Sequence, residues 1–121
     1  MNVFDSSALL AFLQSEPGAA TVRDRLVNGG TCSAANWSEV AQKILASNYS
    51  WPRARALLLG LGLTIQPVTV DDAEWAAAQW SRTAPLSLAD RLCLALGERL
   101  GTDILTCDQQ WSGRPGVVVV R

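Results

Sequence analysis

The stretch VFDSSALLAF, residues 3–12, places an apolar start, one carboxylate and a run of small and then apolar residues one after another. We interpret it as a short strand that ends at Phe4, the acid Asp5, and a helix that begins at Ser7. Along the rest of the chain, short β-branched or apolar segments alternate with longer helical patterns. This alternation is typical of a parallel sheet covered by helices.

The expected fold class is therefore α/β. We predict a single α/β/α layer domain over residues 1–121, with a central, mainly parallel sheet of four to five strands. Strands are predicted at residues 2–4, 30–33, 63–68, 103–106 and 117–120. Helices are predicted at residues 7–15, 19–28, 34–48, 51–59, 71–82 and 88–100. The last helix shows its period well, with Leu88, Leu92, Ala95 and Leu96 on one stripe.

Composition is consistent with one folded domain. Of the 121 residues, 49% are hydrophobic and 17% charged, which suffices to bury a core. No basic segment precedes an apolar one at the start, so we expect a soluble, unsecreted protein that does not enter membranes. Three widely spaced cysteines offer neither a disulfide framework nor a zinc ribbon, which favours the reducing cytoplasm.

Charge and residue types exclude several functions. A formal net charge of -1 excludes a strongly basic, purely electrostatic nucleic-acid binder, so any RNA contact must be local. The chain has no histidine, which removes Ser-His and Cys-His catalysis and histidine metal ligation. The chemistry must therefore depend on carboxylates, hydroxyls, cysteine or a metal.

Four acids stand where such a fold places a ligand. Asp5 and Asp108 follow predicted strands, whose carboxyl ends border the crevice of a parallel sheet. Glu39 and Asp90 lie where helices begin. Carboxylates within ~5 Å repel by about 3 kcal/mol per pair at an effective dielectric of ~20, so a cation must compensate. Oxygen ligands without histidine favour Mg²⁺ or Mn²⁺.

Each acid also has a purely structural interpretation. Asp5 could cap the helix that follows it, and Asp108 could open a short helical turn. Ser87 and Asn36 each stand three residues before one of the other two acids, which is the spacing of a capping box. For those two acids taken singly, the cap is favoured by roughly two to one. Their shared location at one sheet edge favours the metal interpretation for all four together.

The segments VFDSSALLAF, SAANWSEV, LSLADRLCLAL and ILTCDQQW, in that order, resemble the PIN-domain ribonucleases. More narrowly, they resemble the VapC-type toxins of bacterial toxin–antitoxin pairs. The likeness covers nearly the whole chain and implies one PIN-like nuclease domain. It implies Mg²⁺-dependent endonucleolytic cleavage of RNA, in which a metal-activated water attacks the phosphorus and a 3′-hydroxyl leaves. It further implies a homodimer that a VapB-type antitoxin neutralises.

The resemblance also implies roles for individual residues. Asp5, Asp90 and Asp108 match the positions that ligate the metal, and Glu39 completes the acidic quartet by helping to hold a second metal or a water. The polar positions beside those acids match Ser6, Asn36 and Thr106. Cys107 occupies a position that varies in the family, and we assign it no catalytic role.

Other conspicuous residues have two interpretations each. Arg91 could steady the site or contact a phosphate, or form a surface ion pair. The five tryptophans are expected mostly in the core. Trp37, Trp51 and the leucines at 57–59 could instead form a groove for a protein partner.

Two alternatives from other classes stay open. A haloacid-dehalogenase-like phosphatase also opens with an aspartate at a strand end, but it requires a second acid where Ser7 stands and a catalytic lysine that Lys43, the only lysine, is poorly placed to supply. The other alternative is a non-catalytic dimer that acts with an antitoxin as a DNA-binding repressor complex.

Overall fold

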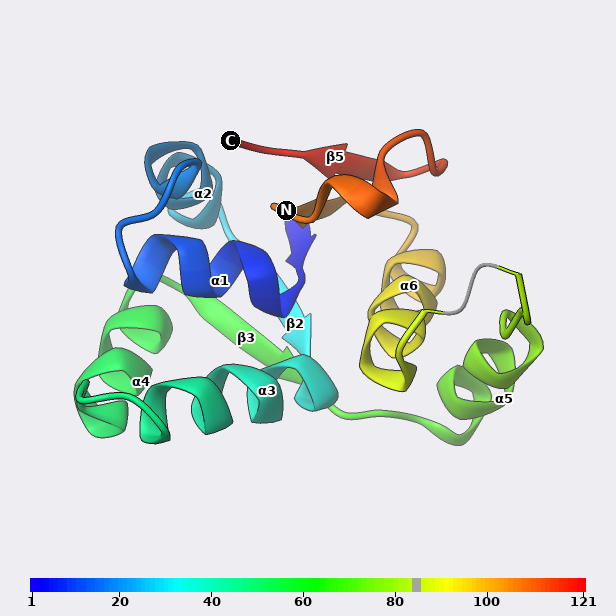
Figure 1. Cartoon of the computed structure of the whole chain (residues 1–121), viewed down its shortest axis with the longest axis horizontal. Helices are drawn as coiled ribbons and strands as arrows, with labels where there is room; N and C mark the ends of the chain where they lie inside the picture. Colours follow the sequence, from blue (N-terminus) through cyan, green and yellow to red (C-terminus); the bar gives the residue numbers. More distant parts are fainter. Residues whose placement is uncertain (84–85) are drawn as a thin grey trace.

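A computed structural model of the chain describes residues 1–83 and 86–121 (Figure 1). The strands are β1 (Asn2–Phe4), β2 (Gly30–Ser33), β3 (Leu63–Gln66), β4 (Ile104–Thr106) and β5 (Val117–Val119). The helices are α1 (Ser6–Leu13), α2 (Ala19–Leu26), α3 (Ala34–Leu45), α4 (Trp51–Gly60), α5 (Val70–Ala78), α6 (Leu88–Leu100) and the 3₁₀ helix η1 (Gln109–Trp111). Within the described residues, none of these helices combines the length and apolar composition that crossing a bilayer requires.

The five strands form one sheet in the order β3-β2-β1-β4-β5, and every neighbouring pair is parallel. The predicted α/β/α layer fold is confirmed. The chain builds the sheet outward from β1 through β2 to β3 and then returns to place β4 on the other side of β1. At such a reversal the carboxyl ends of the two adjacent strands flank a crevice, so β1 and β4 define the ligand edge of this sheet.

Alternating side chains of β1 and β4 divide the core between the two faces of the sheet. Phe4 and Leu105 are buried in the larger core, to which α1 to α4 contribute. Val3 and Ile104 are buried in the smaller core against α6. Figure 1 shows α1 to α4 gathered on one side of the molecule and α6 on the other, with α5 outermost beside α6.

The close approach of α6 to β4 depends on Gly97. A Cβ atom there would lie 2.7 Å from Cδ1 of Ile104, so only glycine permits this packing. Gly101 ends the helix in the left-handed conformation at φ +62°. Because α6 leads through this turn into the start of β4, its first turn, with Asp90, lies at the opposite edge, where β1 and β4 end.

Most differences from the predicted bounds follow from local hydrogen bonds. Helix α1 begins one residue early because Asp5 is its N-cap. Helix α3 ends at Leu45 instead of residue 48, and the Ser47 hydroxyl donates to the Ile44 carbonyl at 2.7 Å. Strand β3 stops at Gln66 because Pro67 has no N–H with which to continue the ladder.

Two further predictions were wrong. Helix α5 spans Val70–Ala78 rather than residues 71–82, and a capping box between Thr69 and Asp72 sets its start. Leu88 is 58% exposed and does not belong to the buried stripe of α6. As the first residue after the N-cap Ser87, Leu88 lies at the helix end, beyond the part of α6 that packs on the sheet.

Candidate active site at the ends of β1 and β4

Asp5 directly follows the last residue of β1 and caps α1, and it is only 2% exposed. Its Oδ1 atom accepts hydrogen bonds from the Ala8 N–H at 2.9 Å and the Ser7 hydroxyl at 2.7 Å. Its Oδ2 atom accepts one from the Thr106 hydroxyl at 2.5 Å. A carboxylate has about four lone-pair sites, so about one remains on Oδ2 for a further ligand. The cap interpretation of Asp5 is confirmed, and it leaves room for a second role.

Two hydroxyl groups join the ends of β1 and β4. The Thr106 hydroxyl accepts a hydrogen bond from the Asp108 N–H at 3.0 Å, and the Ser7 hydroxyl accepts one from the Cys107 N–H at 2.9 Å. The two hydroxyl oxygens lie 3.1 Å apart. Each hydroxyl also donates to Asp5, so the backbone that carries Asp108 is held in a fixed relation to Asp5. Asp108 also caps η1, as its structural interpretation predicted.

Glu39 belongs to a second small network on α1 and α3. Its Oε1 atom accepts hydrogen bonds from the Ser6 hydroxyl at 2.7 Å and from Asn36 Nδ2 at 3.1 Å. The cap of α3 is Ser33, so the prediction of a capping box at Asn36 was wrong. Asn36 is completely buried, and its Oδ1 atom accepts no hydrogen bond from any residue that the structure describes. A buried acceptor without a donor beside an acid suits a cation or a cation's water.

Asp90 lies half-buried in the first turn of α6, with Ser87 as the N-cap, as its spacing predicted. Burial raises the pKa of Asp90 above its usual value of 3.8. A hydrogen bond with Ser87 lowers this pKa, but by less than burial raises it. The negative charges of Glu39 and Asp108 raise this pKa further. Asp90 is therefore within electrostatic reach of two acids that come from other elements.

The pKa of Asp5 is raised as well. Burial raises the pKa of Asp5 from 3.8 to about 6, although its hydrogen bonds to Thr106, Ala8 and Ser7 lower it. The charge of Asp90 adds to the increase. Asp90 therefore lies within electrostatic reach of each of the other three acids that the sequence singles out.

Among the residues that the structure describes, no cation forms an ion pair with any of these four acids. Within residues 1–83 and 86–121, the single ion pair joins Arg99 to Asp72, on α6 and α5. In the same ranges, no three cysteine or acidic side chains converge into a ready-made metal cage. Mg²⁺ does not need one, because it keeps several waters and binds proteins through one or two carboxylates. The hard oxygen donors and the unpaired Asn36 Oδ1 atom fit such a partly hydrated ion.

Ser7 belongs to the candidate site, although the sequence indicated it only as a helix start and as the position where a phosphatase would need a second acid. The structure shows that its hydroxyl contacts Asp5, Thr106 and the backbone of Cys107 together. The available signal was a hydroxyl two residues after a strand-end aspartate, at the start of a helix. Such a hydroxyl can bond the side chain that caps the helix.

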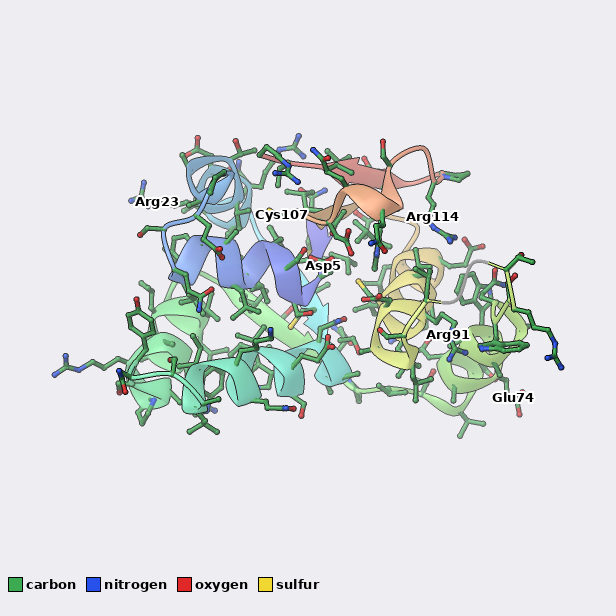
Figure 2. The ribbon with its side chains drawn as sticks, viewed as in Figure 1. Asp5, Arg23, Glu74, Arg91, Cys107 and Arg114 are labelled. Carbon is green, nitrogen blue, oxygen red and sulfur yellow. The ribbon has the colours of Figure 1, made fainter. Side chains whose placement is uncertain are left out.

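Arg91 lies away from Asp5, between α6 and α5 (Figure 2). Its guanidinium donates to the carbonyl oxygens of Ala76, at 2.9 Å, and Leu86, at 3.2 Å. The predicted surface ion pair is therefore wrong. Arg91 instead ties α5 to the segment that precedes α6, and so supports the helix turn that carries Asp90.

Trp37 of α3 and Trp51 of α4 pack against each other and against the core. Trp37 and Trp51 lie edge to face, with ring centroids 5.0 Å apart, and both pack against the larger core. Leu58 is fully buried, whereas Leu57 is 48% exposed and lines a cavity of about 380 Å³ together with Tyr49. Trp111 lies in the smaller core, and Trp80 is 52% exposed.

Comparisons with known proteins agree with this fold. Residues 3–116 match the sequence model of the PIN domain. No curated protein matches the sequence significantly. A toxin–antitoxin complex from Klebsiella pneumoniae is similar at TM-score 0.75 and 21% identity, over 98% of this chain and 97% of that one.

Two further solved structures have the same fold. VapC20 from Mycobacterium tuberculosis, described as a sarcin-ricin loop cleaving toxin, is similar at TM-score 0.76 and 19% identity over 100% of both chains. VapBC2 from Rickettsia felis, bound to a DNA fragment from its promoter, is similar at TM-score 0.70 and 12% identity, over 98% of this chain and 96% of that one.

Proposed function

The chain belongs to the PIN domain family, and from that membership we propose that it is a Mg²⁺-dependent endoribonuclease and the toxin of a toxin–antitoxin pair. Mn²⁺ is the alternative ion. The solved relatives support this proposal, because they include toxin–antitoxin assemblies and a toxin described as cleaving the sarcin-ricin loop. The toxin–antitoxin relatives also support a VapB-type antitoxin as partner, and we propose a homodimer from the family resemblance.

One observation carries the proposal. The charges of Glu39 and Asp108 act on Asp90, the charge of Asp90 acts on Asp5, and no cation among the described residues pairs with any of these four acids. Burial and neighbouring negative charge both disfavour the charged forms of Asp5 and Asp90, and a bound cation would offset this penalty. A divalent ion at the crevice between β1 and β4 provides that offset.

Asp5, Asp90 and Asp108 would hold the ion directly or through its waters, with Glu39 beside them. Asp5 contributes the lone pair of Oδ2 that its three hydrogen bonds leave free. Its carboxylate stays in one orientation because Ser7 and Thr106 hold it from two elements. When bound, Mg²⁺ supplies positive charge to phosphate oxygens and lowers the pKa of water.

Glu39, with Asn36 holding it in place, would orient a water in the crevice. Glu39 is fixed through Oε1 by Ser6 and Asn36, which leaves Oε2 to accept a hydrogen bond from a water. Asn36 is completely buried, so its part is to hold Glu39 in place. An acceptor fixed in this way would orient a water beside the ion, which contributes to catalysis by positioning.

The test is cleavage of total cellular RNA by the purified protein, followed by mapping of new 5′ ends. We expect discrete cleavage sites with Mg²⁺, none with EDTA, and none with a folded Asp90→Asn variant. If the wild-type protein produces no cleavage sites with Mg²⁺ or Mn²⁺ but binds promoter DNA together with its antitoxin, the ribonuclease proposal is wrong and the non-catalytic repressor subunit gains support.

A further inference from the structure

Two adjoining cavities lie along the outer side of α1. The first, of about 440 Å³, is lined by Ser7, Leu10, Gln14, Lys43, Cys107 and Arg121, among others. The second, of about 390 Å³, shares Leu10 and Lys43 with the first and extends to Ser6 and Glu39. We call the two together the α1 trough.

The α1 trough begins at the acidic crevice. The Ser7 hydroxyl that lines its first cavity donates to Asp5 at 2.7 Å. The Ser6 hydroxyl that lines its second cavity donates to Glu39 at 2.7 Å. In Figure 2, Cys107, which also lines the first cavity, lies beside the same end of α1 as Asp5. Asp5, Asp90 and Asp108 line neither cavity, so a chain in the trough would reach the proposed cleavage site past Ser6, Ser7 and Glu39.

Two cations flank this path. Lys43 projects from α3 and forms no ion pair within the described residues. Arg121 follows β5, and Gln109, with its amide oxygen toward the guanidinium, accepts its Nε at 2.9 Å and its Nη2 at 3.3 Å. Arg121 is thus held in place with further donors free. Glu16 and Glu39 also line the trough, so its charge is mixed.

The negative charge of the site explains why cations beside it would matter for RNA binding. A site of four carboxylates on a chain of net charge -1 repels a polyanion, and a single ion offsets only part of that repulsion. Local cations that hold phosphates beside the acids would offset the remaining repulsion. Lys43 and Arg121 stand in cavities that border Ser6 and Ser7, which bond directly to Glu39 and Asp5.

We propose that the α1 trough binds the phosphates of single-stranded RNA next to the cleaved bond, with Lys43 and Arg121 as their contacts. This inference rests on the proposed ribonuclease function and adds the path of the substrate. Contacts of this kind bind without reading the bases.

The test uses a fluorescein-labelled dodecamer of uridine, because phosphate contacts do not depend on sequence. Binding is followed by anisotropy with Mg²⁺ in an Asp90→Asn background, in which RNA is not consumed. We expect Lys43→Gln and Arg121→Gln each to weaken binding by about 3- to 10-fold and to reduce the salt slope by about 0.7. Arg55→Gln is the matched control, since Arg55 is exposed on α4 and lines neither cavity of the trough.

A second readout uses Lys43 as the only lysine. RNA should protect Lys43 from acetylation, read by peptide mass spectrometry, while the Met1 amine reacts equally with and without RNA. If wild-type protein cleaves RNA but both variants bind like Arg55→Gln, or if the variants weaken only the antitoxin complex, the trough proposal is overturned. If wild-type protein neither cleaves nor binds RNA, the proposed function itself has failed.

Discussion

Thr106 and Asp5 are 101 positions apart in the chain, yet the Thr106 hydroxyl donates to Asp5 Oδ2 at 2.5 Å. The bond exists because β1 and β4 are parallel neighbours that end at the same edge of the sheet. The same hydroxyl accepts from the Asp108 N–H, so one side chain holds two of the proposed metal ligands. The pairing of β1 with β4, a strand from the last fifth of the chain, thus brings Thr106 and Asp108 to the site that contains Asp5.

Substitution of an acid of the candidate site should reduce RNA cleavage, whereas substitution of an acid elsewhere on the surface should not. Asp5→Asn and Asp90→Asn should each reduce Mg²⁺-dependent RNA cleavage by more than about 100-fold, because each removes a proposed ligand but keeps a capping side chain or a similar shape. Gel assays of cleavage and circular dichroism together measure activity and fold. Asp71→Asn is the control, since Asp71 is exposed at the start of α5. Equal cleavage by wild type and both site variants would refute the roles of Asp5 and Asp90.

Ser7 should act by positioning Asp5. Ser7→Ala removes the hydroxyl that contacts Asp5 and Cys107, so cleavage should fall by about 10- to 100-fold and the Mg²⁺ concentration for half-maximal rate should rise. Ser7→Thr keeps a hydroxyl and should restore most of the rate. A Ser7→Ala enzyme with unchanged Mg²⁺ dependence would show that Ser7 has only a structural role.

Stability of the metal-free protein should fall as the pH rises from about 4 to 6. In this window folded Asp5, with its pKa raised to about 6, keeps a proton that the unfolded chain, with a pKa of 3.8, has released. The shift corresponds to about 3 kcal/mol of lost stability above pH 6. Urea unfolding in EDTA measures it, and Asp5→Asn should remove most of this slope. The same slope in both proteins would contradict the assignment to Asp5.

The ion pair between Asp72 and Arg99 should stabilise the packing of α5 on α6. Arg99 donates to both carboxylate oxygens, at 3.0 and 3.1 Å. Burial raises the pKa of Asp72, but Arg99 and Thr69 outweigh it and hold the pKa below 3.8. Arg99→Gln should therefore cost about 1–2 kcal/mol at pH 7. The difference from wild type should shrink below pH 3.8, as Asp72 takes up a proton. A difference in urea unfolding that is independent of pH would contradict this.

The sequence predicted the parts of the site that depend on local pattern. Strands β1 and β2 and helix α6 have the predicted bounds, because apolar residues and caps such as Ser87 define them within a few residues. The position of Asp5 at a strand end followed from the same pattern. The edge at which it meets Asp108 followed from the parallel fold.

Contacts between residues far apart in the chain could not be predicted from the sequence. The bonds from Ser6 to Glu39 and from Ser7 to Asp5 depend on how α1 lies against α3 and β4, which no local pattern specifies. The spacing of Asn36 to Glu39 favours a cap as one interpretation, but Ser33 caps the helix and Asn36 is a buried side chain. Arg91 likewise bonds to backbone carbonyls that only tertiary packing brings near.

The most direct test of the central claim is Mn²⁺ binding to the purified protein, followed by loss of the free-ion electron paramagnetic resonance signal and by competition with Mg²⁺. The wild-type protein should bind Mn²⁺ and release it to Mg²⁺, and Asp5→Asn and Asp90→Asn should each weaken binding by at least about 10-fold. Wild-type protein that leaves the free-ion signal unchanged, or site variants that bind Mn²⁺ as tightly as wild type, would contradict the claim that these acids form a divalent-ion site.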